Sequence, residues 1–157
     1  MFDPTTLTGI HTWLSLIAIA AGLVVVAGLL SSDGAVWGWV ALFLAAALAT
    51  SVTGFLLPFT QILPSHVTGV VALVVLAPTI LAWAFPAGQG RRRVFVVGSV
   101  ISLYLLALAG LTQLFAKIPA LRETAPTQSE PSFVAAQLAV LAAFGWVGFT
   151  AARGVGR

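Results

Sequence analysis

The run LTGIHTWLSLIAIAAGLVVVAGLL, residues 7–30, carries no Asp, Glu, Lys or Arg. At about 1.5 Å of rise per residue, roughly 20 helical residues cross the hydrocarbon layer of a bilayer. Hydrocarbon offers the backbone no hydrogen-bond partner, so a segment that crosses it must be a helix or part of a closed barrel. The alternation of a barrel strand is missing here. The run therefore predicts a spanning helix, with Asp3 as N-cap and Pro4 in the first turn.

Four more runs of the same kind follow, separated by short segments rich in polar residues, Pro or Gly. They cover residues 35–57, 65–85, 94–115 and 132–152. No Lys or Arg precedes the first run, so we expect that helix to be retained and not cleaved as a signal peptide. The pattern predicts an all-α integral membrane protein, a bundle of five transmembrane helices, with residues 1–157 as a single domain.

The composition supports a membrane location. Only 7% of the residues are charged and 60% are hydrophobic, whereas a soluble domain carries roughly 25% charged residues. We therefore expect the lipid bilayer to be a main partner. The pI near 10.7 could point to nucleic acid, but the net charge is only +3, so no nucleic acid partner is predicted. The absence of Cys excludes disulfides, thiolate catalysis and Cys-ligated clusters.

The arginines indicate how the chain is oriented. Five crossings place the termini on opposite sides, and one side then holds five arginines: Arg91, Arg92, Arg93, Arg153 and Arg157. The other side holds only Lys117 and Arg122. Cytoplasmic loops carry the excess of Lys and Arg. We therefore expect a bacterial inner (plasma) membrane protein with a periplasmic N-terminus, a cytoplasmic C-terminus, and a cytoplasmic belt of Trp37, Trp39 and Trp83.

Polar side chains within the spans gather toward the predicted outer end. No Asp, Glu, Lys or Arg lies inside a span, which disfavours a proton-coupled transporter. Four helices each contribute one residue to a predicted polar outer-leaflet cluster: Ser15, Thr53, Gln113 and Gln137. The alternative is that these side chains bond nearby carbonyls or lipid headgroups.

His11 and His66 are the only histidines, and both lie near the predicted outer end of a helix. Neutral imidazole ligates haem iron, copper or zinc. A haem b held between two helices needs two such ligands at similar depth. His11 and His66 are therefore the predicted cofactor-binding residues, as axial ligands of haem b. Another metal such as copper, hydrogen bonding to a quinone, and purely structural histidines stay open as alternatives.

Small residues recur at four-residue intervals in three of the predicted helices. The rows are Ala18 and Gly22, Gly98 and Ser102, and Ala135, Ala139 and Ala143. Such rows let membrane helices approach closely, although Ala- and Gly-rich helices also produce them by chance. They predict helix contacts within the bundle or with another subunit.

The stretch from Gln113 to Gln137 resembles a segment of a family of small, uncharacterised bacterial inner-membrane proteins. It contains QLFAKIPAL at residues 113–121 and APTQSEP at residues 125–131. The resemblance covers this stretch only. It implies a bacterial inner-membrane location and supplies no activity and no site residues.

Three classes of function fit the sequence. The first is a small haem-binding subunit for redox or electron transfer, with its site near the outer leaflet. The second is a non-catalytic accessory or assembly subunit of a larger membrane complex, with partner membrane subunits or further copies of itself. The third is a channel or transporter for a small neutral solute. An enzyme is not favoured, because no nucleophile–base pair, carboxylate pair or phosphate-binding loop is recognisable.

Overall fold

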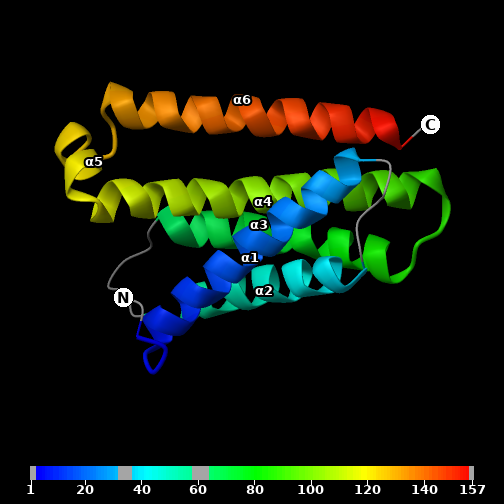
Figure 1. The fold of residues 1–157 in the computed structure, drawn as a ribbon. Coiled ribbons are helices and arrows are strands. Elements are labelled where there is room, and N and C mark those ends of the chain that lie inside the picture. Colours follow the sequence, from blue (N-terminus) through cyan, green and yellow to red (C-terminus); the bar gives the residue numbers. More distant parts are fainter. Residues whose placement is uncertain (1–2, 32–36, 58–63, 156–157) are drawn as a thin grey trace.

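The computed structural model describes residues 3–31, 37–57 and 64–155, without the side chains of residues 64–66. This described part of the chain folds into six helices and has no strand. Figure 1 shows them in chain order: α1 Leu7–Leu30, α2 Trp37–Leu56, α3 Pro64–Ala84, α4 Gly88–Lys117, α5 Pro119–Thr124 and α6 Pro131–Gly154. All except the short α5 are long and apolar enough to cross a membrane. The expected all-α bundle with five spanning helices is confirmed.

Helices α1 to α4 form a closed ring, in which each helix packs against the next and α4 returns to α1. α6 lies outside the ring along α4, with a smaller contact to α1 (Figure 1). The start of α1 and the end of α6 lie at opposite ends of the bundle, as an odd number of crossings requires. The ring encloses the main core, and α6 is an added outer layer.

The interior of the ring is filled by apolar side chains from all four helices. Val25, Phe43, Leu76 and Leu103 are each at most 1% exposed. Gly22 of α1 lies directly against two of them, because an added Cβ would come within 2.7 Å of Leu103 Cδ1 and 2.8 Å of Phe43 Cε2. Lipid tails are as apolar as these side chains, so close packing, and not escape from water, stabilises this core.

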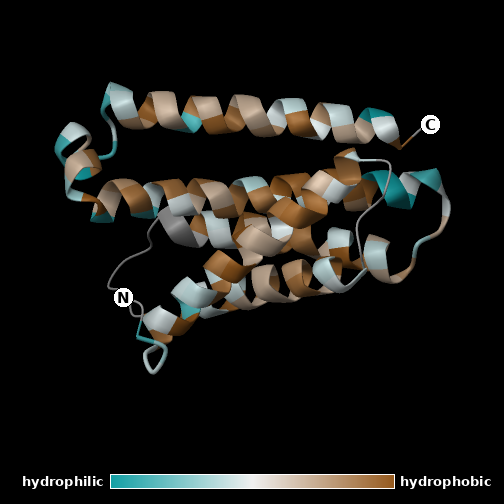
Figure 2. Ribbon diagram, in the orientation of Figure 1, coloured by the Kyte–Doolittle hydropathy of each residue, from teal (hydrophilic) through white to brown (hydrophobic). Residues whose placement is uncertain are grey.

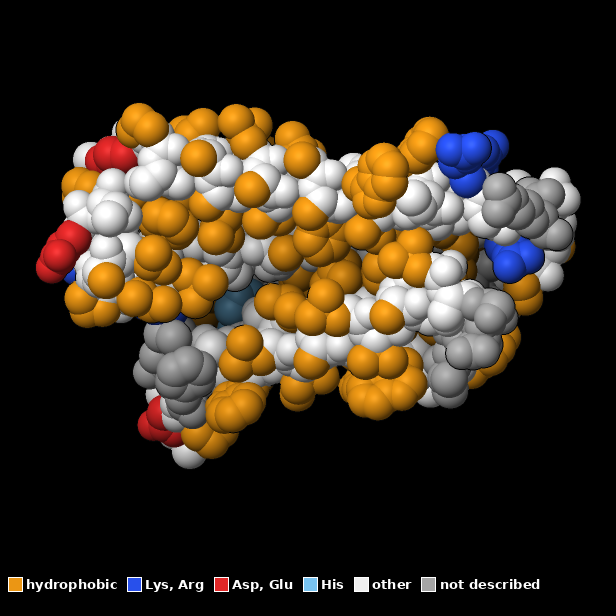
Figure 3. All heavy atoms as spheres, turned by 45° about the horizontal axis from the view of Figure 1, so that its top comes forward, with side chains coloured by type: hydrophobic (Ala, Val, Ile, Leu, Met, Phe, Trp, Pro, Cys, Tyr) orange, Lys and Arg blue, Asp and Glu red, His pale blue; other side chains and the backbone are white. Residues whose placement is uncertain are grey.

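The outer surface is apolar along the helices and charged at the ends. Figure 2 shows hydrophobic residues over the length of the bundle, and Figure 3 shows acidic side chains at one end and the main basic cluster at the other. Trp146 is 70% exposed and Val74 67%. Soluble proteins rarely expose apolar surface on this scale, whereas a surface in contact with lipid tails is expected to be apolar. The chain is thus a multi-pass membrane protein.

The start of α4 differs from the expectation. α4 begins at Gly88, so Arg91, Arg92 and Arg93 lie in its first turns and not in a loop before a helix at residue 94. Gly88 has φ +74°, a left-handed conformation that glycine adopts without strain, and the helix starts from it. Apolar periodicity could not predict this start, because three exposed arginines carry no apolar pattern. We call the end of the bundle where α4 begins the arginine end.

Two smaller expectations are also corrected. Thr6, and not Asp3, caps α1: its Oγ1 accepts a hydrogen bond from the Gly9 N–H at 3.1 Å. Asp3 instead accepts hydrogen bonds from the N–H and the hydroxyl of Thr5. The segment at residues 116–131, expected to be a loop, contains α5, with Pro119 in its first turn. The expected connection at residues 59–63 lies outside the described residues.

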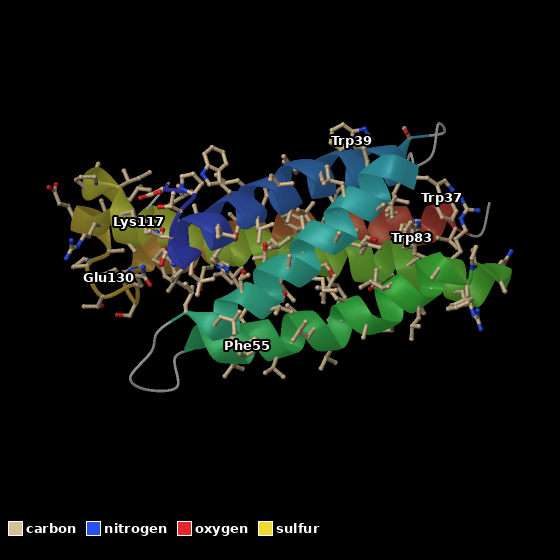
Figure 4. The ribbon with its side chains drawn as sticks, turned by 90° about the horizontal axis from the view of Figure 1, so that it is seen from below. Trp37, Trp39, Phe55, Trp83, Lys117 and Glu130 are labelled. Carbon is tan, nitrogen blue, oxygen red and sulfur yellow. The ribbon has the colours of Figure 1, made fainter. Side chains whose placement is uncertain are left out.

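The aromatic belt follows the arginine end. Figure 4 shows Trp37, Trp39 and Trp83 toward the end where α4 begins, and Lys117 and Glu130 at the other end. Tryptophan favours the boundary between hydrocarbon and headgroups. The three tryptophans and the arginines therefore lie toward the same end of the bundle, and the assignment of this end to the cytoplasmic interface stays a prediction.

Candidate functional site

The polar side chains of α1 and α2 meet at the end of the bundle opposite to the arginine end. His11 is half-buried, and its Nδ1 lies 3.0 Å from Oγ1 of Thr53 on α2. Its Cε1 lies beside Gly54, where an added Cβ would be 3.4 Å away. The imidazole thus lies beside the α2 backbone at Gly54. The two helices are thereby joined by a polar contact inside a predicted membrane span.

The hydrogen bonds of Thr53 favour one tautomer of His11. A threonine hydroxyl has one proton to donate. The Thr53 hydroxyl has two carbonyl acceptors within its own helix, Ala49 O at 2.8 Å and Thr50 O at 3.2 Å. When it donates there, its oxygen accepts from His11, and the contact fits the tautomer with the proton on Nδ1. In that tautomer the Nε2 atom has a lone pair, to which no described residue donates a hydrogen bond.

Ser15, another predicted member of the polar cluster, lies one turn further along α1. Its hydroxyl donates to the backbone carbonyl of His11 at 2.8 Å. Thr12 is bonded in the same way to Thr8 O, also at 2.8 Å. Helical Ser and Thr commonly satisfy their hydroxyls like this. The structure thus brings the side chains of His11 and Thr53 together, whereas the hydroxyls of Ser15 and Thr12 bond backbone carbonyls of their own helix.

Gln113 and Gln137, the other two predicted members, do not join this group in the described part of the chain. Gln113 is exposed on α4 and Gln137 is half-buried on α6. Neither makes a hydrogen bond with His11, Ser15 or Thr53. The amide that does connect elements nearby is that of Gln128, whose Nε2 donates to Thr112 O at 3.0 Å. Sequence analysis missed Gln128, because nothing in a loop sequence shows that its side chain folds back onto α4.

His66 lies in the first turn of α3, and its side chain is outside the described residues. α1 and α3 begin at the same end of the bundle (Figure 1). They are opposite members of the ring, with α2 and α4 between them. The described residues contain no group of three or more His, Cys, Asp or Glu side chains placed to hold a metal ion. The pairing of His11 with His66 stays a prediction.

A second set of hydroxyl groups is buried in the ring and was not part of the predicted cluster. Thr50, Thr79, Ser99 and Ser102 are each at most 7% exposed. Thr79 donates to Val75 O at 2.7 Å. The hydroxyl oxygens of the other three have no hydrogen-bond partner among the described residues. Sequence analysis interpreted Gly98 and Ser102 only as a packing row, and both are indeed buried.

Aromatic and polar contacts hold the loop end of α6 on α4. The rings of Phe115 and Phe133, both buried, meet edge to face with centroids 5.1 Å apart. In the loop, the Glu130 carboxylate accepts hydrogen bonds from the N–H and hydroxyl of Thr127 and the N–H of Ser129. Desolvation by itself would raise the pKa of Glu130, but these hydrogen bonds together lower it below its ordinary value. The entrance to α6 is therefore ordered by local contacts.

α6 presents two different faces. The inner face packs on α4, for example through Phe144, whose ring centroid lies 5.9 Å from that of Tyr104. In its most apolar stretch only 6% of α6 is buried, against 33% for α2 and for α4. The outer face is exposed and carries the predicted small-residue row Ala135, Ala139 and Ala143. We call these three residues the α6 row.

No protein-family model, no curated protein and no solved structure matches this chain. The resemblance over residues 113–137 therefore stays a prediction. The five-span helical fold is established, and any assignment of function rests on the geometry described above.

Proposed function

We propose that this protein is a non-catalytic accessory subunit of a larger membrane complex, which binds a transmembrane helix of a partner protein through the α6 row. One observation carries the proposal. The row lies on the exposed face of the least buried helix, where no part of the described chain covers it.

The other small-residue rows of the chain support this proposal, because each of them packs against a neighbouring helix. Ala18 is 0% exposed. An added Cβ on Gly22 would press on side chains of α2 and α4, and one on Gly98 would collide with Thr79 Oγ1 of α3. A small side chain has no packing advantage against lipid tails. Against another helix, it lets the second backbone approach to close van der Waals contact. The same pattern on α6 points to a helix from outside the chain.

The substitution Ala139→Leu tests the proposal. A leucine in the centre of the row blocks close approach, so a partner that co-purifies in fixed stoichiometry from mild detergent should be lost. Ala45→Leu is the matched control, since Ala45 is also exposed but lies on α2. A complex that tolerates A139L, or an assembly made only of copies of this chain, would contradict the proposal.

The geometry of His11 favours a second candidate, a haem-binding subunit for electron transfer. An axial histidine needs a free Nε2 and commonly has its other ring nitrogen held by a hydrogen bond. The Nδ1-protonated tautomer of His11, in which Nδ1 donates to Thr53 Oγ1, has both features. His11 would hold the iron of haem b through Nε2, and Thr53 would orient the ring. The group itself supplies one-electron chemistry when bound. His66, from the same end of the bundle, is the proposed second ligand.

An absorption spectrum separates the two candidates. Protein expressed with added haem and purified in mild detergent should show a Soret band if His11 and His66 bind haem, and His11→Ala should remove it. Thr53→Val should keep the band but shift the reduction potential, since the imidazole loses its hydrogen bond. A wild-type sample without a Soret band would eliminate the haem candidate and leave the accessory-subunit proposal intact.

We further propose a bacterial inner membrane location with the arginine end in the cytoplasm. The exposed Arg91, Arg92, Arg93 and Arg153 support it, since the cytoplasmic side carries the positive excess. Fluorescent-protein fusions test the orientation. A fluorescent protein attached at the C-terminus should fluoresce, whereas one attached directly after Lys117 would be exported and should not fluoresce. The opposite pattern would reverse the assignment. A channel for a neutral solute is not proposed, because apolar side chains fill the ring.

A further inference from the structure

We propose that the arginine end binds an anionic phospholipid, whose phosphate contacts Arg92 and Arg93 and whose acyl chain occupies a pocket beside Trp37 and Trp83. Neither the accessory-subunit proposal nor the haem candidate depends on this site. It lies at the opposite end of the bundle from His11, and on different helices from the α6 row.

The pocket is formed where α2, α3 and α4 meet. It has a volume of about 300 Å³, and Trp37, Trp83, Phe95 and Pro86 supply apolar walls while Gly88 and Arg92 supply its polar part. The Trp37 and Trp83 rings lie 5.2 Å apart and are inclined by 42° (Figure 4). Ligand sites typically span roughly 300–1,000 Å³. The pocket is at the lower end of this range, and its mostly apolar walls suit one end of an acyl chain.

A second apolar groove also has an arginine of α4 in its lining. It runs between α3 and α4, has a volume of about 430 Å³, and is lined by Val74, Pro78 and Val97, with Arg93 among its lining residues. Two arginines adjacent in the sequence of α4, Arg92 and Arg93, thus each line an apolar groove. A phospholipid has the matching arrangement of one charged group and two apolar chains. The structure therefore fits a diacyl lipid better than a free fatty acid.

The charge at the start of α4 selects an anion. Helix N-termini carry a partial positive charge, and cations placed there are unfavourable unless an anion is near. α4 has no acidic residue in its first turn, and its N-cap residue, Ala87, makes no side-chain cap. Arg91 is engaged by the Phe85 carbonyl at 2.7 Å. Arg92 and Arg93 are exposed and form no ion pair among the described residues.

The position of the pocket favours a membrane lipid over a soluble phosphate. Its apolar walls include tryptophans of the interfacial belt, at the depth where phospholipid headgroups meet hydrocarbon. Basic pockets between transmembrane helices at the membrane surface bind anionic headgroups by electrostatic attraction. A soluble phosphate would make no use of the two apolar grooves.

Quenching of tryptophan fluorescence by brominated lipids tests the site on the whole protein in mild detergent. Phosphatidylglycerol with brominated acyl chains should quench at lower concentration than brominated phosphatidylcholine. The preference should fall roughly fivefold for each arginine removed, so Arg92→Gln with Arg93→Gln should nearly abolish it. Trp37→Phe with Trp83→Phe should remove the preferential component of the quenching. Arg153→Gln is the matched control, because it removes an equally exposed arginine from α6.

Three outcomes would overturn the proposal. The first is equal quenching of the wild-type protein by the two lipids, a result that does not depend on any variant folding. The second is an unchanged preference in the double arginine variant. The third is displacement of the brominated lipid by millimolar inorganic phosphate, which would assign the arginines to a free anion. As a control for folding, each variant should unfold at the same midpoint as the wild-type protein when both are in phosphatidylcholine.

Discussion

The ring of α1 to α4 and the outer helix α6 both carry small residues at four-residue intervals, but these residues have different surroundings. Gly22 and Gly98 lie at positions where an added Cβ would press on a neighbouring helix. Gly145 of α6 has no neighbouring atom within 4 Å of such a Cβ. Small residues on the ring close its interior, whereas the small residues of the α6 row face outward. The pattern identifies a surface that permits close approach, and only the fold tells which of these surfaces is already covered.

The largest expected effect comes from detaching α6. Phe133→Ala removes a buried ring that meets Phe115, and should cost about 3 kcal/mol, the lower end of the range for buried Phe→Ala changes. Thermal unfolding in detergent measures the loss, and limited proteolysis between α5 and α6 should become faster. The exposed aromatic Trp146 is the matched control, and Trp146→Ala should change the midpoint little. Equal losses in both variants would contradict the two-faced description of α6.

The next effect tests the ring. Gly98→Ala places a Cβ against Thr79 of α3 and should destabilise the protein by about 1–3 kcal/mol, as overpacking does. Gly145→Ala makes the same chemical change on α6 in open space and should be neutral. Thermal unfolding of both variants is the measurement. Adding Thr79→Ala to Gly98→Ala should recover part of the loss, and no recovery would show that the contact is not the cause.

A smaller effect concerns the polar contact between α1 and α2. Thr53→Val keeps the shape of the side chain and removes the acceptor of the His11 proton, so it should cost about 0.6–1.7 kcal/mol, as interhelical hydrogen bonds in membranes do. A double-mutant cycle with His11→Ala isolates the pair, and Thr53→Ser should retain most of the stability. A coupling of zero would show that the contact does not stabilise the ring.

The loop before α6 should respond to pH. Because hydrogen bonds hold the pKa of Glu130 below its ordinary value, its carboxylate stabilises the loop above the unfolded-state pKa, and this contribution is lost as pH falls through the lowered pKa. The protection of the Thr127 and Ser129 amides against hydrogen exchange, taken relative to the intrinsic exchange rate at each pH, should therefore fall in acid. In Glu130→Gln this loss of protection should be absent. An identical pH profile in wild type and variant would show that another group titrates.

The smallest effect on folding is expected at the α6 row. Ala139→Leu should change the free energy of unfolding by less than about 0.5 kcal/mol, as surface substitutions generally do, because Ala139 is exposed. The same variant should lose its partner under the accessory-subunit proposal. Stability and assembly are thus separated in one protein. A large drop in the unfolding midpoint would instead show that the row packs within the chain.

Much of the fold could be predicted, and less of the candidate site. All five spans were located with bounds close to those observed, except at the start of α4, because the hydrocarbon length sets the size of an apolar run. Thr53 and His11 lie 42 residues apart. Their shared depth followed from topology, but their contact depends on how α1 and α2 rotate about their axes. Gln113 and Gln137 show how far prediction from depth can go, because they were expected at a similar depth but make no hydrogen bond with His11.

By itself, the sequence determined that the chain has five helices apolar and long enough to cross a membrane and that all of its arginines except Arg122 lie toward one end. The reason is that bilayer thickness and the cost of burying charge act on each segment separately. The tertiary structure alone decided which face of each helix is covered, the contact of His11 with Thr53, and the grooves beside Arg92 and Arg93. These features arise between segments, where packing fixes rotations and distances that no single run of residues encodes.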